Sequence, residues 1–189
     1  MQWFEKYEDK LGVRYKTFHK LFSIAIDREL KNFVETGTSR GKDKFYYLRP
    51  KINWKDGMST ILFAEYVKLN RGQLWTCDID AKNIRNASQF LRDYSLHANL
   101  IVSDSLKFLR DFSETIDVLY LDSHDGNLPG ANEHQLREAQ LSIGKINSNG
   151  LIMLDDKGQK TELSIPFLIS EGWEIVFESE NQVIFQKAD

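Results

Sequence analysis

Short apolar segments and amphipathic segments alternate along nearly the whole chain. Five apolar segments have the length and composition of buried β-strands, at residues 32–36, 73–79, 99–104, 116–122 and 150–156. Segments with apolar residues at helical spacing flank them, at 15–30, 58–69, 81–94, 105–112, 132–146 and 161–172. This alternation predicts an α/β fold that is Rossmann-like and doubly wound, with a mostly parallel sheet covered by helices on both faces.

The C-terminal segment predicts a different kind of strand pair. Residues 173–188 form two strand-like runs joined by a tight turn at Glu180 and Asn181, which is typical of an antiparallel hairpin. The hairpin brings the sheet to seven strands. Pro166 should kink or shorten the helix before it. With 189 residues and no linker, we expect a single domain over 1–189 with a helical N-terminal extension at 1–31.

Charge and composition exclude several classes of protein. The net charge of −3 gives no electrostatic reason to expect nucleic-acid binding. The single cysteine, Cys77, cannot form an internal disulfide. The first residues lack the apolar core of a secretory signal, and no stretch approaches the roughly 20 apolar residues that span a bilayer. We therefore expect a cytoplasmic protein without membrane contacts.

Acidic residues stand at the end of every predicted parallel strand. They are Glu35, Asp78, Asp104, Asp122, Asp155 and Asp156. In sheets of this kind ligands bind beyond the carboxyl ends of the strands, near the point where strand order reverses. A single acid at such a position is commonly a helix cap or turn former. Five strands in succession that end in acid predict a ligand site.

The first strand runs into a loop with two glycines, "ETGTSRG", from Glu35 to Gly41. Gly37 and Gly41 would let the backbone approach a ligand closely, although an ordinary turn has the same composition. A dinucleotide fingerprint would have a third glycine and lead directly into a helix. The acid at Glu35 would also repel a pyrophosphate, so a ligand with a positive charge and hydroxyl groups is favoured.

The next two acids fit the parts of a nucleoside. Asp78 ends the second strand, where an acid can accept hydrogen bonds from ribose hydroxyls. Asp104 ends the third strand beside Ser105, in a position to accept from an exocyclic amine such as that of adenine. Asp80 is expected to cap the following helix. These residues predict a site for adenosine without phosphate.

These motifs, in this order, resemble those of the class I S-adenosylmethionine-dependent methyltransferases from about Asn32 to the end of the chain. The matching segments are "VETGTSRG", "CDID", "VSDS", "IDVLYLD" and the closing hairpin. The resemblance implies that the glycine loop surrounds the amino-acid part of the cofactor, Asp78 the ribose and Asp104 the adenine. The cofactor-binding residues that we expect are Glu35, Thr36, Gly37, Thr38, Gly41, Ser59, Asp78, Ile79, Asp104, Ser105 and Asp122.

Asp122, Asp155 and Asp156 would meet at one rim of the sheet. Three carboxylates without a nearby Lys or Arg need a cation or protons, and oxygen ligands suit Mg²⁺, Mn²⁺ or Ca²⁺. The alternative is that Asp155 and Asp156 only cap the loop that follows them. The pattern is similar to the metal-dependent small-molecule O-methyltransferases of the catechol and macrolide-sugar types. The catechol type has a lysine three residues after the first acid, where this chain has Asp125.

His124 is therefore our candidate general base, since histidine exchanges protons near neutral pH; an exposed loop histidine without a role is the alternative. The predicted reaction is methyl transfer to a hydroxyl of a small molecule, with Asp122 holding the ion that would lower the pKa of that hydroxyl. The alternatives are a metal-free methyltransferase acting on nitrogen or protein, an NAD-dependent oxidoreductase and a non-catalytic adenosine-binding module.

Two further expectations concern the aromatic residues. The inserted segment 42–57 contains four aromatic side chains and is predicted to be a lid that shapes the acceptor pocket, with packing on the N-terminal helix or a second subunit as the alternative. Trp3, Phe4 and Tyr7, taken as exposed, favour a homodimer.

Overall fold

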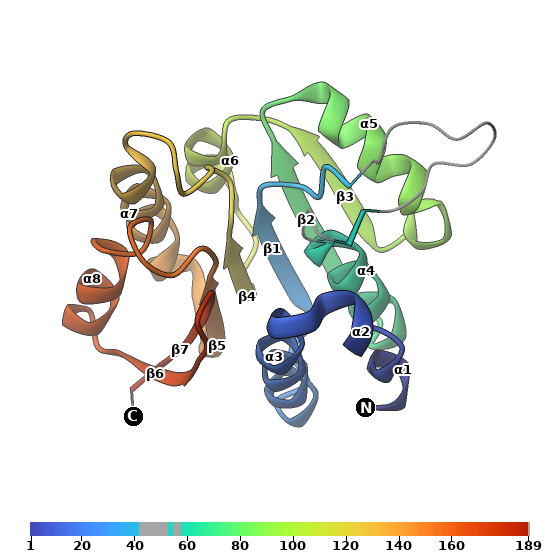
Figure 1. Cartoon of the computed structure of the whole chain (residues 1–189), viewed down its shortest axis with the longest axis horizontal. Helices are drawn as coiled ribbons and strands as arrows, with labels where there is room; N and C mark the ends of the chain where they lie inside the picture. The colour runs from blue at the N-terminus through green and yellow to red at the C-terminus, as the bar shows by residue number, and fades with distance from the viewer. Residues whose placement is uncertain (42–52, 55–57, 189) are drawn as a thin grey trace.

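The computed structural model describes residues 1–41, 53–54 and 58–188, and its centre is a seven-stranded sheet in the order β3-β2-β1-β4-β5-β7-β6 (Figure 1). The strands are β1 Asn32–Thr36, β2 Gln73–Asp78, β3 Ala98–Val102, β4 Ile116–Leu121, β5 Ile146–Leu154, β6 Trp173–Glu178 and β7 Val183–Lys187. Strands β1 to β5 are parallel, and β7 runs antiparallel to β5 and β6. The predicted sheet and its closing hairpin are confirmed.

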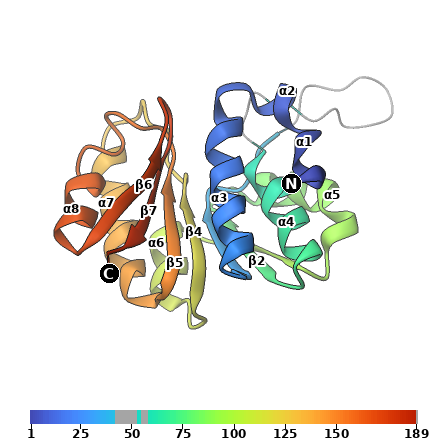
Figure 2. The ribbon, with the colours of Figure 1, turned by 90° about the horizontal axis from the view of Figure 1, so that it is seen from below.

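Helices cover both faces of the sheet, as Figure 2 shows. One face carries α3 (Tyr15–Asp27), α4 (Ser59–Leu69) and α5 (Ala81–Phe90), together with the short α1 (Gln2–Glu5) and α2 (Glu8–Leu11). The other face carries α6 (Ser105–Asp111), α7 (Ala131–Ser142) and α8 (Ser164–Ser170). Single 3₁₀ turns lie at η1 (Gly12–Arg14), η3 (Arg92–Tyr94) and η4 (Ile143–Lys145).

Strand β4 shows why the sheet is buried on both sides. All six of its residues are buried. Because successive side chains of a strand point to opposite faces, Val118 and Tyr120 belong to the core under α3 and α4, and Leu119 and Leu121 to the core under α6 and α7. A continuous apolar run is the sequence signature of such a strand.

The N-terminal extension is part of the core. Phe4 is 0% exposed and Tyr7 is 4% exposed, and the Phe4 ring packs at 5.2 Å from Phe22. The expectation that these two aromatics lie exposed at a dimer interface is therefore wrong in its premise. Trp54 lies 5.2 Å from the Tyr7 ring, so this residue of the inserted segment packs on the N-terminal helices, as the alternative reading proposed. Of the predicted lid, residues 42–52 and 55–57 lie outside the described residues.

Two local features follow the sequence closely. Helix α8 begins only at Ser164, so that Pro166 falls in its first turn, where a missing N–H is tolerated. Asp80 caps α5 by accepting from the N–H of Lys82 at 2.8 Å. No helix in the described ranges is long and apolar enough to cross a membrane.

Strand order reverses between β1 and β4, and this switch positions the site. β1 is followed by α4 on one face, whereas β4 is followed by α7 on the other. The loops after the two strands stay in contact, since a Cβ on Gly37 would lie 2.2 Å from the carbonyl oxygen of Asp122. Gly37 also has a φ of +87°, so both the backbone and the close approach require glycine here.

Candidate functional site

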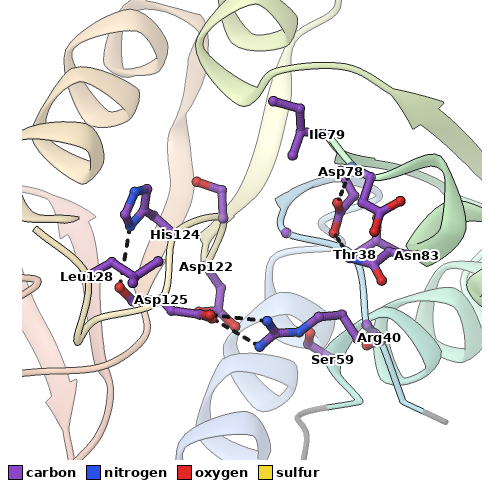
Figure 3. Close-up of a pocket in the computed structure, with 14 residues that line it drawn as sticks. Thr38, Arg40, Ser59, Asp78, Ile79, Asn83, Asp122, His124, Asp125 and Leu128 are labelled. Atoms are coloured by element: carbon purple, nitrogen blue, oxygen red, sulfur yellow. Dashed lines mark hydrogen bonds and ion pairs between the residues drawn. The ribbon is translucent and has the colours of Figure 1, made fainter. Parts of the chain in front are cut away.

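Two adjoining hollows open at the carboxyl ends of β1, β2, β3 and β4, where the strand order predicted a ligand site. One has a volume of about 210 Å³ and lies between the glycine loop and the loop after β4 (Figure 3). The other has a volume of about 280 Å³ and extends toward α6 and α7. Both are lined by Gly37, Asp78, Ile79, Ser123 and His124, so they form one cleft.

Asp78 is held in place at the centre of this cleft. Its Oδ1 accepts from the N–H of Asp80 at 2.8 Å, and its Oδ2 accepts from Asn83 Nδ2 at 3.0 Å. Burial raises the pKa of Asp78, and these two donors act in the opposite direction. Each oxygen keeps a further lone pair, so the carboxylate can accept hydrogen bonds from a pair of ligand hydroxyls. Ile79, which is 75% exposed, offers an apolar surface next to it.

Asp104 lines the second hollow and also caps α6, where its Oδ1 accepts from the N–H of Lys107 at 3.0 Å. Ser105 beside it is connected to side chains of α7. Its Oγ lies 2.9 Å from His134 Nε2 and 3.3 Å from Ser123 Oγ, and Ser123 donates to the buried Glu138 at 2.6 Å.

Glu138, whose Oε1 lies 3.6 Å from His134 Nε2, raises the pKa of His134 more than burial lowers it. His134 and Ser123 thus add polar groups to a wall for which only Asp104 and Ser105 were predicted. The sequence carried a local signal only for His134, which stands four residues before Glu138 and so shares a helix face with it.

Glu35 lies behind the cleft and lines neither hollow. Its carboxylate is fully buried and accepts from Ser59 Oγ at 2.5 Å, Thr60 Oγ1 at 2.7 Å and Thr76 Oγ1 at 2.6 Å. Burial raises the pKa of Glu35 to about 7 although these donors lower it. Glu35 was expected to line the ligand site, but the structure places one of its donors, Ser59, in the lining of the cleft instead.

Of three other residues that were predicted to bind the cofactor, one lines the cleft and two do not. Thr38 lines the cleft, and its Oγ1 lies 2.8 Å from Thr76 Oγ1. Thr36 is buried within β1, and Gly41 packs against Met58; neither of the two lines the cleft.

An ion pair crosses one side of the first hollow. Arg40 of the glycine loop donates to both carboxylate oxygens of Asp125, at 3.0 Å and 3.3 Å (Figure 3). Both side chains are about half exposed. His124 lies next to the pair and lines both hollows, with its Nδ1 3.4 Å from the carbonyl oxygen of Asp125.

The acid trio does meet at one rim, but two cationic side chains lie among the carboxylates. Lys160 Nζ is 2.9 Å from Asp122 Oδ1 and 3.4 Å from Asp156 Oδ2, and Arg14 Nη2 is 3.3 Å from Asp155 Oδ2. The premise that no Lys or Arg lies nearby is therefore wrong. Within the described ranges, no group of three or more His, Cys, Asp or Glu side chains is arranged to hold a metal ion. These residues do not fit a divalent cation.

The family model of a methyltransferase domain matches residues 54–157, which is more than half of the chain. No curated protein sequence matches. Among solved structures, methyltransferase PaMTH1 of Podospora anserina, determined with bound SAH, is similar over 100% of this chain and 86% of its own, at 14% identity and a TM-score of 0.66.

A Staphylococcus aureus protein assigned as a caffeoyl-CoA O-methyltransferase is similar over 91% of this chain and 83% of its own, at 13% identity and a TM-score of 0.66. A methyltransferase of Geobacter sulfurreducens is similar over 92% and 79%, at 18% identity and a TM-score of 0.62. At these identities the three structures show a shared fold. With the family match, the fold and the cleft at its switch point, the chain belongs to the methyltransferase domain family and is an S-adenosylmethionine-dependent methyltransferase.

Proposed function

We propose that the protein transfers a methyl group from S-adenosylmethionine to a hydroxyl oxygen of a small molecule in the cytoplasm. The observation that carries this proposal is the cleft itself, which presents a fixed carboxylate, Asp78, on one wall and a histidine, His124, on the other. S-adenosylmethionine supplies a methyl group that is already electrophilic because it is bound to a sulfonium. The protein has to bind the cofactor, align the acceptor and remove one proton.

The lining residues match the parts of that cofactor. Asp78 would accept the ribose hydroxyls, and Ile79 and Asp104 would contact the adenine in the second hollow. The paired charges of Arg40 and Asp125 border the first hollow, where the guanidinium would complement the carboxylate of the amino-acid group and the acid its ammonium.

His124 is the proposed general base. A proton on Nδ1 directed at the carbonyl oxygen of Asp125 would leave Nε2 as the basic nitrogen of the ring. This nitrogen would accept the hydroxyl proton while the acceptor oxygen bonds to the methyl carbon and the carbon–sulfur bond breaks. The net charge of −3 supports a small acceptor over a nucleic acid, since it offers no basic surplus for phosphates.

The proposal is tested by the release of S-adenosylhomocysteine in the presence of catechols, sugars, primary amines and peptides. We expect turnover with a hydroxyl acceptor, and we expect His124→Ala to lower kcat by roughly a hundredfold while the affinity for S-adenosylhomocysteine changes far less. His19→Ala, an exposed histidine on α3, is the matched control.

Turnover confined to amines or peptides would instead support the alternative of a nitrogen or protein acceptor. A wild-type kcat for His124→Ala would remove the histidine from the mechanism. Thermal stabilisation by NAD but not by S-adenosylmethionine or its product would contradict the choice of cofactor.

A further inference from the structure

Lys160 is almost completely buried among the acids that end β4 and β5. Its side chain is 1% exposed, whereas those of Asp122 and Asp156 are 27% and 40% exposed. The ammonium therefore lies beneath the rim, and the two carboxylates lie between it and solvent. Asp122 also lines the cleft, so the ammonium is in contact with a wall of the proposed cofactor and acceptor site.

The chain after β5 is built to return Lys160 to this position. Asp156 has a φ of +54°, a left-handed conformation that aspartate tolerates better than most residues. A tight turn follows, in which the N–H of Gly158 donates to Thr161 Oγ1 at 3.0 Å and the N–H of Thr161 donates to the carbonyl oxygen of Gly158 at 3.2 Å. Lys160 stands inside this turn, and its Nζ reaches the carboxylates of Asp122 and Asp156.

The electrostatics keep the side chain charged. Burial alone would lower the pKa of Lys160, but Asp122 and the other acids raise it further, so the net direction is upward. Burial and Asp155 raise the pKa of Asp122, and Lys160 opposes them. Arg14 provides the positive partner of Asp155, which is 1% exposed at its side chain. A buried charge of this kind is stable only when it is paired.

A divalent cation and this ammonium would compete for one place. An ion bound by Asp122 and Asp156 has to lie about 2.0–2.6 Å from their oxygens. Lys160 Nζ is already 2.9 Å and 3.4 Å from those same two carboxylates. Two positive charges about 3 Å apart repel strongly at a buried site, so one excludes the other.

We propose that Lys160 is a built-in cation that takes the place of a divalent metal ion at this rim, and that it serves as a positioning residue for Asp122. The inference deepens the proposed function, since Asp122 borders the same cleft, and it predicts an enzyme that binds no divalent cation there. The test needs neither an acceptor nor turnover, so its failure is distinguishable from a failure of the proposed reaction.

The experiment compares the wild-type chain with Lys160→Met, which keeps the length of the side chain but removes its charge. Lys157→Met, which removes a more exposed lysine paired with Glu178, is the matched control. Mn²⁺ binding is measured by electron paramagnetic resonance, and Tm is measured with Mn²⁺, with Mg²⁺ and with EDTA. For wild type and Lys157→Met we expect no bound Mn²⁺ at millimolar concentration and no change in Tm.

Lys160→Met should have a lower Tm in EDTA, because Arg14 is then the cation that remains for the three carboxylates Asp122, Asp155 and Asp156. It should bind one Mn²⁺ and gain roughly 5–10 °C in Tm at a hundredfold excess over Kd. Saturable Mn²⁺ binding by the wild-type chain overturns the inference, and so does a folded Lys160→Met that binds none. If Lys160→Met does not fold, the wild-type titration and Lys160→Arg, which should stay metal-free, decide in its place.

Discussion

Glu35 makes the stability of this protein depend on pH in a direction opposite to that of most carboxylates. Its pKa rises from 4.5 to about 7 because the carboxylate is fully buried and the three hydroxyls around it only partly compensate. The folded chain therefore binds a proton at Glu35 more tightly than the unfolded chain does. The stability that the protonated group contributes is fully present below pH 4.5 and is lost as pH rises through 7.

The size of this effect follows from the two pKa values. The difference between 4.5 and about 7 corresponds to about 3 kcal/mol, at about 1.4 kcal/mol for each pH unit. Glu35→Gln removes the charge but keeps an acceptor for the surrounding hydroxyls, which can also reorient to accept from the amide. We expect the variant to be more stable than wild type at pH 8 and to lose this advantage as pH approaches 4.5.

Urea unfolding of both proteins between pH 4.5 and 8.5 measures this difference directly. The gap in the free energy of unfolding between Glu35→Gln and wild type should grow by about 3 kcal/mol over that range. Glu114→Gln, at an exposed loop position, serves as the control and should stay parallel to wild type. Parallel curves for Glu35→Gln and wild type would refute the claim that burial determines the charge of Glu35.

Two further substitutions test the cleft. Gly37→Ala should lower the free energy of unfolding by at least about 1 kcal/mol in urea, because the residue has a positive φ and the new Cβ would lie 2.2 Å from the Asp122 carbonyl oxygen; wild-type stability would show that the loop can shift freely. Asp78→Asn should weaken S-adenosylhomocysteine binding by roughly tenfold in calorimetry, because one acceptor of the ribose hydroxyls is lost; an unchanged Kd, with the exposed Asp111→Asn as control, would place the ribose elsewhere.

The sheet and the place of the site were predictable because their signals are local. The apolar runs and the helical spacing lie within single segments, so most strands of the sheet were found near their true bounds. The exception is β5, which begins at Ile146, where the sequence pattern still predicted a helix. Parallel strands bring their carboxyl ends to one edge, and this geometry alone placed Asp78, Asp104 and Asp122 in one cleft. The cap at Asp80 was predictable for the same reason, because a helix cap depends only on the capping residue and the start of the helix that follows it.

What each acid faces was decided by the tertiary structure. Lys160 meets Asp122 across 38 positions of sequence, and the N-terminal extension brings Arg14 to Asp155. Neither pairing is encoded in a local pattern, because both depend on the path of the chain between the elements. Glu35 likewise looked like a ligand contact until α4 and β2 surrounded it with hydroxyls. The sequence by itself determined the edge of the sheet at which the chemistry occurs. The packing of distant side chains determined which of its charges are already neutralised, because only the folded chain brings opposite charges within contact distance.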